Sequence, residues 1–171
     1  MFDQPIVFVD LETTGGSIIH DRITEIGIIE VGPQGVSEWS TLVNPQTSIP
    51  PFIERLTGIS NAMVAEAPTF AEMADEVLQR LQGRVFVAHN ARFDYGFLKN
   101  EFKRHERNFR ATVVCSVKLS RRLFPDEFKH NLDSIISRHQ LPLESRHRAL
   151  SDARAVWLFF RKLEQEMPGQ L

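Results

Sequence analysis

The hydrophobic and polar positions of the chain follow a two-residue period in some stretches and a helical period in others. Apolar, β-prone residues fill short runs that are bounded by turn signals, which is typical of buried strands. The predicted strands cover residues 6–9, 22–31, 36–43, 85–88 and 112–115. The turn at 32–35 contains two glycines and a proline, so the first three strands are expected to form an antiparallel meander.

Apolar residues at helical spacing fill most of the remaining chain. Thr69 is a plausible N-cap, and Phe70, Met73, Val77 and Leu81 then form one apolar face. Further helices are predicted over residues 52–56, 93–106, 117–123, 149–166 and from Asn131 onward. This order of elements predicts an α/β fold with a mixed five-stranded sheet and helices on both faces.

Two acidic residues stand at the end of the first predicted strand. Asp10 and Glu12 are two positions apart, so an extended backbone points both side chains to the same side. Close carboxylates repel one another and raise each other's pKa unless a cation lies between them. Hard oxygen ligands favour magnesium, manganese or calcium over zinc. An ordinary strand end with two solvated acids is the alternative interpretation.

A third acid repeats this arrangement. The strand at 85–88 is followed by a polar turn, and Asp94 lies near the start of the next predicted helix. Functional groups in open α/β sheets gather where strands end. An acid that only interacts with the helix dipole would give the same local pattern.

His147 and Asp152 near the last predicted helix complete the set of candidate residues. Five helical steps separate two side chains by about 140°, so the two are not a ligand pair on one helix face. They can act together if His147 lies in the loop and Asp152 lies in the first helical turn. An imidazole is a suitable general base near neutral pH, although a histidine in a basic loop can also simply be solvated.

Length and composition suit one globular domain, expected to cover residues 1–171 with a core at about 5–165. No apolar run is long enough to span a membrane, and the residues after Met1 do not resemble a signal peptide. Cys115 is the single cysteine, which excludes an internal disulfide and a cysteine-rich zinc site and fits a cytoplasmic location.

The charges are unevenly distributed along the chain. Residues 1–83 hold twelve acidic and three basic residues, whereas residues 84–171 hold ten acidic and seventeen basic ones. The basic half could therefore face phosphates, or both halves could be solvated surfaces. The chain contains no G-x-S-x-G, Walker A or H-E-x-x-H pattern, and these absences argue against three other classes of enzyme.

Together the motifs resemble those of the DEDDh (DnaQ-like) 3′→5′ exonucleases, in the group that contains the proofreading epsilon subunit of bacterial DNA polymerase III. Three segments in the family's order carry the resemblance: Asp10-Leu11-Glu12-Thr13-Thr14-Gly15, Val87-Ala88-His89-Asn90-Ala91-Arg92-Phe93-Asp94 and His147-Arg148-Ala149-Leu150-Ser151-Asp152. The sister subclass has a tyrosine where this chain has Arg148. Cys115-Ser116 stands where many relatives have Asp-Thr, which bears on the subgroup only.

The resemblance implies a ribonuclease H-like fold and a two-metal hydrolysis of phosphodiester bonds with Mg²⁺ or Mn²⁺. It implies that Asp10, Glu12 and Asp152 hold one ion and that Asp10 and Asp94 hold the second. His147 would take the proton from the attacking water. The products would be nucleoside 5′-monophosphates, released from the 3′ end of single-stranded or frayed DNA.

For the substrate, the resemblance implies that main-chain groups near Thr13 and Thr14 hold the terminal hydroxyl. Leu56 would pack on the last base, and Phe93 would line its pocket. The expected partners are a nucleic acid with a free 3′ end and a polymerase subunit or a fused endonuclease, in replication, proofreading or repair. A 3′→5′ exoribonuclease is the alternative enzyme. A non-catalytic nucleic-acid-binding module and a receiver-like signalling domain are alternatives of other classes.

Overall fold

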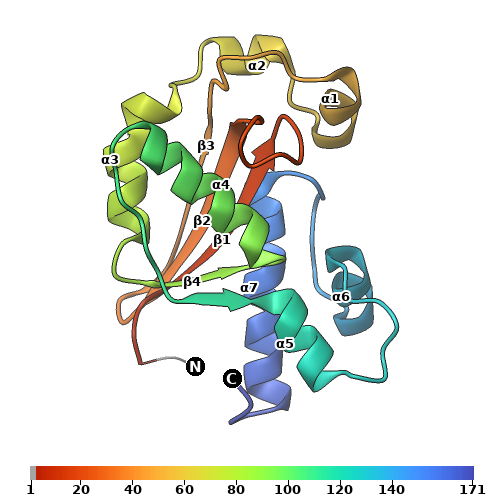
Figure 1. The fold of residues 1–171 in the computed structure, drawn as a ribbon. Coiled ribbons are helices and arrows are strands. Elements are labelled where there is room, and N and C mark those ends of the chain that lie inside the picture. The colour runs from red at the N-terminus through yellow and green to blue at the C-terminus, as the bar shows by residue number, and fades with distance from the viewer. Residues whose placement is uncertain (1–2) are drawn as a thin grey trace.

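The computed structural model describes residues 3–171, and a five-stranded sheet forms its centre (Figure 1). Met1 and Phe2, where the signal-peptide expectation begins, lie outside the described residues. The strands are β1 Ile6–Thr13, β2 Ile23–Gly32, β3 Gly35–Leu42, β4 Val85–Ala88 and β5 Val113–Cys115. The helices are α1 Pro51–Thr57, α2 Asn61–Ala65, α3 Phe70–Leu81, α4 Ala91–Arg104, α5 Ser116–Leu123, α6 Leu132–His139 and α7 Ala149–Glu166.

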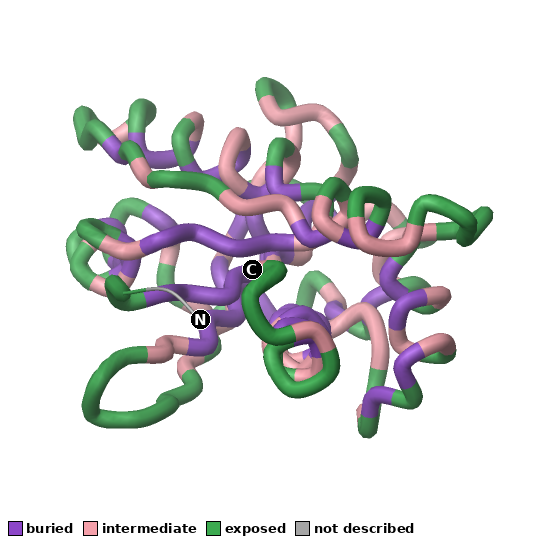
Figure 2. Tube along the Cα trace, turned by 90° about the horizontal axis from the view of Figure 1, so that it is seen from below, coloured by how far each residue is buried: buried purple, intermediate pink, exposed green. Residues whose placement is uncertain are grey.

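The sheet is mixed, with strand order β3-β2-β1-β4-β5. The first three strands pair antiparallel, whereas β4 runs parallel to β1 and β5 runs parallel to β4. This confirms the predicted sheet and its initial meander. β1 lies in the middle, and residues on both of its faces are buried. Figure 2 shows that the buried segments lie in the interior of the molecule.

Helices cover both faces of the sheet, and alternation along β1 decides which residues each face receives. Val7, Val9 and Leu11 join the core formed with α3 and α4. Ile6 and Phe8 join the core formed with α6 and α7. The Phe8 ring meets the Phe160 ring of α7 edge-on, with centroids 5.3 Å apart. The even-numbered side chains of β1 therefore face α7.

Several boundaries differ from those predicted. β1 does not end at Val9 but continues through the acids to Thr13, because β2 supplies backbone partners along the whole segment. The helix over 61–65 was not predicted, since its five residues are too few to show a helical period. α4 begins at Ala91 and ends at Arg104, two residues earlier at each end than expected. No helix among residues 3–171 combines the length and apolar character needed to cross a membrane.

The start of α7 lies directly against the backbone of β2 at Gly27. A Cβ atom added at Gly27 would lie 2.4 Å from the Leu150 backbone nitrogen and 2.5 Å from the Ala149 carbonyl carbon. Real side chains do not come this close to backbone atoms, so the helix start would have to move. Gly27 is also the β2 partner of Asp10, which places the first turn of α7 beside the end of β1.

We therefore expect Gly27→Ala to lower the free energy of unfolding by about 1–3 kcal/mol, as overpacking of a tight contact does. Denaturant unfolding followed by circular dichroism measures this. Gly32→Ala on the same strand is the matched control, because its Cβ would meet no atom within 4 Å. Equal stability of the two variants would contradict the role assigned to this close approach.

Candidate active site

β1 places Asp10 and Glu12 on the face of the sheet that α7 covers. Both continue the even-numbered series that Ile6 and Phe8 begin, so their side chains point toward α7. Asp10 pairs with Gly27 and Glu12 pairs with Glu25, and the register shifts immediately after Glu12. Pairing through Glu12 keeps both carboxylates on a rigid strand.

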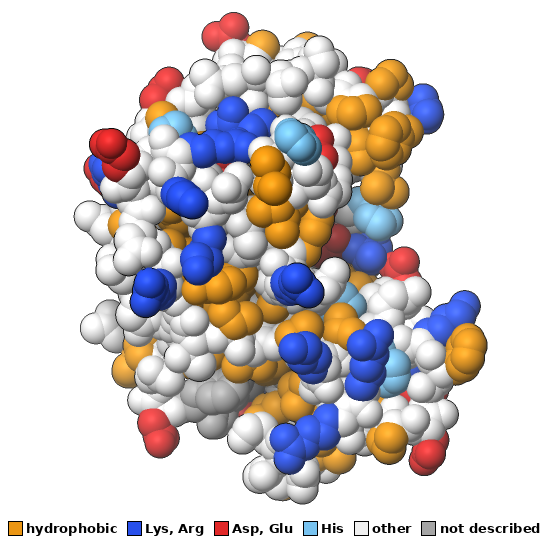
Figure 3. Space-filling view, viewed as in Figure 1, with side chains coloured by type: hydrophobic (Ala, Val, Ile, Leu, Met, Phe, Trp, Pro, Cys, Tyr) orange, Lys and Arg blue, Asp and Glu red, His pale blue; other side chains and the backbone are white. Residues whose placement is uncertain are grey.

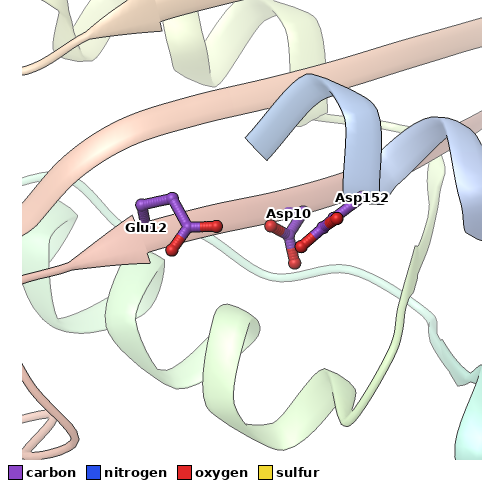
Figure 4. A group of neighbouring side chains, drawn as sticks. All are labelled: Asp10, Glu12 and Asp152. Atoms are coloured by element: carbon purple, nitrogen blue, oxygen red, sulfur yellow. The ribbon is translucent and has the colours of Figure 1, made fainter. Parts of the chain in front are cut away.

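The first turn of α7 brings Asp152 to the same place. The Asp152 amide donates to the Arg148 carbonyl oxygen at 3.0 Å, which fixes the residue within the helix. Asp10, Glu12 and Asp152 each offer one carboxylate oxygen, and these oxygens lie within 4.8 Å of one another. Figure 4 shows the two β1 side chains and the Asp152 side chain from α7 turned toward a common space. Three hard oxygen donors at this spacing fit a divalent cation such as Mg²⁺ or Mn²⁺.

Asp94 reaches the end of β1 from α4. Its Oδ1 accepts a hydrogen bond from the Leu11 amide at 3.1 Å, and the side chain is buried. It is not one of the three residues whose oxygens come together, but its charge raises the pKa of both Asp10 and Glu12. Burial raises the pKa of Asp94 well above its ordinary value, and the Leu11 amide opposes this.

Crowding of the carboxylates changes their protonation. Burial, followed by the charges of Asp94, Glu12 and Asp152, raises the pKa of Asp10 well above its ordinary value. Burial, followed by the charges of Asp152 and Glu25, raises the pKa of Glu12 from 4.5 to about 8. Without a cation, the site therefore retains protons at neutral pH, and a divalent cation would relieve the repulsion.

Arg146 supplies part of the missing positive charge. Its Nη1 lies 2.5 Å from Asp152 Oδ1, and its Nε donates to Asp133 Oδ1 at 2.5 Å. The contact with Asp152 is a close ion pair. Burial raises the pKa of Asp152, and the adjacent Arg146 guanidinium opposes the rise. The sequence alone assigns no role to Arg146, because its distances to Asp133 and Asp152 depend on the loop conformation.

His147 lies in the loop before α7, as its spacing from Asp152 required. Its backbone has φ +62°, a left-handed conformation that is uncommon for a residue with a side chain. Its amide donates to Asp152 Oδ1 at 3.3 Å, and its side chain is half-buried. The backbone of His147 thus helps to orient Asp152.

Glu25 is a buried acid that sequence reasoning missed. Its carboxylate accepts from Arg148 Nη2 at 2.6 Å and from the Ala149 amide at 2.8 Å. These bonds tie the first residues of α7 to β2 and hold the helix start in place. Glu25 also faces Glu12 across the two strands, a pairing that the register of the predicted meander could have indicated.

The candidate substrate residues differ in accessibility. The Thr13 hydroxyl donates to the Gly15 carbonyl oxygen and the Thr14 hydroxyl donates to Asp21 Oδ1, so both stabilise the turn after β1. Leu56 on α1 is 52% exposed. The Phe93 ring is half-buried, and its centroid lies 4.7 Å from that of Phe97. Leu56 is therefore available to a ligand, whereas Phe93 also belongs to the core.

A cleft of about 530 Å³ opens beside the acids. It is lined by Asp10, His89, Asn90, Val117, Arg121, His130, Asn131, Leu132, Arg146 and Asp152. His89 Nδ1 lies 2.8 Å from the Ser116 hydroxyl, and burial lowers the pKa of His89 to about 4. Figure 3 shows a notch at its right edge, between α1 and the α5–α6 region, with acidic, basic and histidine side chains inside it.

Comparisons with known proteins identify similar chains. A family model described as an exonuclease (RNase_T) matches residues 7–160. A PolC-type DNA polymerase III of Caldanaerobacter subterraneus subsp. tengcongensis is 38% identical over 162 residues, which cover 94% of this chain and 12% of that protein. A 3′-5′ exonuclease DinG of Bacillus subtilis is 40% identical over 172 residues, which cover 98% of this chain and 18% of that protein. The chain thus spans less than a fifth of the length of these two relatives.

Solved structures share the fold. Exonuclease X in complex with 5′ overhanging duplex DNA aligns with a TM-score of 0.73 at 26% identity, covering 94% of this chain and 92% of that one. A zinc-bound complex of E. coli exonuclease I with single-stranded DNA aligns with a TM-score of 0.86, covering 99% of this chain and 42% of that one. At 16% identity the second likeness shows the fold alone.

The raised pKa of Glu12 predicts how stability depends on pH. The Glu12 carboxyl of the folded protein keeps a proton that the same group in the unfolded chain releases above pH 4.5. The metal-free protein should therefore lose stability as pH rises from 4.5 to about 8. In EDTA, we expect the melting temperature of the wild-type protein to fall across this window. It should fall less in the Glu12→Gln variant, and less in the wild-type protein when Mg²⁺ replaces EDTA. Thermal unfolding at several pH values measures this.

Glu72→Gln, on the exposed side of α3, is the matched control and should keep the wild-type slope. A wild-type slope that neither Glu12→Gln nor Mg²⁺ reduces would contradict the assigned repulsion.

Proposed function

The chain belongs to the exonuclease family, and from this membership we propose that it is a divalent-metal-dependent 3′→5′ exonuclease acting on DNA. It would hydrolyse the terminal phosphodiester bond of single strands or frayed ends and release nucleoside 5′-monophosphates. The observation that carries the proposal is the convergence of Asp10, Glu12 and Asp152 within 4.8 Å, from strand and helix positions that the three motifs supply. A pure binding module gains nothing from carboxylates held this close together.

The acids have separate tasks in this proposal. Asp10, Glu12 and Asp152 would hold one ion, and Asp10 would hold a second with Asp94, directly or through water. Divalent ions in such a site make water more acidic and stabilise negative charge on the phosphate. The amide of Leu11 keeps Asp94 at the end of β1, and Arg146 would give up its ion pair with Asp152 when the ions bind.

His147 is the proposed general base. His147 lies five residues before Asp152, in the loop that precedes α7. Its imidazole would accept the proton of the attacking water. The hydrogen bond from its backbone amide to Asp152 Oδ1 would keep the base at a fixed distance from the metal ligand.

The terminal nucleotide would lie between the turn after β1 and α1. The internally bonded Thr13 and Thr14 hold this turn rigid, so main-chain groups there could bind the 3′-hydroxyl. The exposed Leu56 would pack on the last base, and Phe93 would line the pocket. Preorganised groups of this kind position a substrate without further ordering.

The cellular setting follows from the relatives. One relative is a PolC-type DNA polymerase III, which supports a polymerase subunit as partner. A partner endonuclease is proposed from the motif resemblance alone. We propose a cytoplasmic role in replication, proofreading or repair, carried out by residues 1–171 as one domain. An exoribonuclease with the same machinery is the alternative, and matched all-DNA and all-RNA strands would distinguish the two substrates.

Removing a metal ligand tests the activity itself. We expect Asp10→Ala and Asp152→Ala to abolish cleavage, because each removes an oxygen donor from the group of three. A gel of 3′-labelled and 5′-labelled single strands, with Mg²⁺ or EDTA, reads out cleavage, polarity and metal dependence. Asp75→Ala, on the exposed side of α3, should cleave at the wild-type rate. Near-wild-type cleavage by Asp10→Ala in Mg²⁺ would refute the assignment.

His147→Ala tests the general base. Losing a positioned base should reduce kcat by roughly 10²–10⁴-fold. Single-turnover kinetics on a labelled strand measures the chemical step directly. Glu72→Gln, with an exposed side chain on α3, should change nothing. A loss of less than tenfold in His147→Ala would show that another group takes the proton.

A further inference from the structure

The segment between α5 and α6 carries an exposed aromatic side chain. Phe128 is 95% exposed, more than any other large hydrophobic residue among those described. A single exposed apolar residue is ordinary by itself. The surroundings of Phe128 indicate a binding role, because the surface beside it leads to the proposed catalytic acids and carries basic side chains.

A continuous surface path leads from the acids to Phe128. The cleft that holds Asp10 and Asp152 is also lined by His130 and Asn131. Asn131 lines the neighbouring hollow as well, and Phe128 and Lys129 are among the other residues that line it. The Asn131 side chain caps α6 by accepting from the Ser134 amide at 2.9 Å, so the point where the two spaces meet is rigid.

Positive charge accompanies this path. Lys118, Arg121 and Arg122 project from α5, and Lys129 follows Phe128. None of these four side chains forms an ion pair with another residue in the range 3–171.

Acids also lie along this path. Glu127 and Asp133 line the hollow, where Glu127 pairs with Arg138 at 3.5 Å and Asp133 pairs with Arg146 at 2.5 Å. Asp126, next to Glu127 in the chain, is exposed. The segment from α5 to Lys129 nevertheless keeps an excess of positive charge. Figure 3 shows Lys and Arg side chains gathered over the α5 region, below the notch.

We propose that Phe128 stacks on a base of the nucleic-acid strand, upstream of the terminal nucleotide, while the basic side chains of α5 contact the phosphates on the way. Exposed aromatic rings beside basic grooves hold single strands in this manner, since every base offers a flat face. The inference rests on the proposed function for the direction of the strand. It assigns a second contact point, away from the catalytic acids, that would tether the strand between cleavage events.

Equilibrium binding tests this without cleavage. In the Asp10→Ala background, the affinity for a 12-nucleotide deoxy strand is measured by fluorescence anisotropy and compared with that for a dinucleotide. We expect Phe128→Ala to weaken binding of the long strand about tenfold, as loss of one stacked base does. Phe128→Trp should restore the affinity. Val36→Ala, an exposed apolar residue on β3 and outside the path, is the matched control.

Single abasic sites, placed one at a time along the strand, locate the contact. At one upstream position an abasic site should weaken binding by the Asp10→Ala parent about tenfold. The same abasic site should not weaken binding by the Phe128→Ala variant in that background any further. Equal affinity of Phe128→Ala and the parent for the long strand would overturn the inference and leave Phe128 as a contact for another protein. A protein that binds strands through Phe128 yet cleaves none in any metal would instead refute the proposed function alone.

Discussion

Repulsion among carboxylates at the end of β1 is the constraint on which the rest of the structure depends. Asp10, Glu12 and Asp152 lie close enough to share an ion, and their own charges and burial disfavour this arrangement. Only a stiff scaffold keeps such groups together. Pairing of β1 with β2 fixes two of the acids, and the contact of α7 with Gly27 fixes the third.

Ion pairs beside the carboxylates hold the acids in place against this repulsion. The buried Glu25 binds Arg148 and the first amide of α7, and so fastens the helix that carries Asp152. Arg146 contacts Asp152 directly. Removing either partner of a buried, hydrogen-bonded pair leaves a charge uncompensated, which costs more than an exposed pair is worth. Both arginines therefore serve the site, although neither is one of the proposed metal ligands.

Local sequence rules predicted the sheet and the facing of the acids, because both depend on short-range geometry. The two-residue period predicts that Asp10 and Glu12 point to the same side, and in the structure both belong to β1 as alternate residues of one strand. The family match confirms the resemblance drawn from the three motifs. The strand register could have placed Glu25 beside Glu12, but its bonds to Arg148 and to the Ala149 amide could not be predicted, since those partners lie far away in sequence. The contacts of Arg146 could not be predicted either, since they depend on the loop conformation. The left-handed backbone of His147 also has no local signal.

Interactions within the metal-free site are therefore mutually unfavourable, and they are unfavourable at the place where a cation would bind. Burial and crowding that raise the pKa of Glu12 also make a divalent cation a better partner than protons. Arg146 offsets the charge only partly, because one guanidinium reaches Asp152 but makes no bond to Asp10 or Glu12. An arginine that compensated the acids fully would compete with any ion. The partial pairing keeps the fold stable while leaving the acids free to bind a cation.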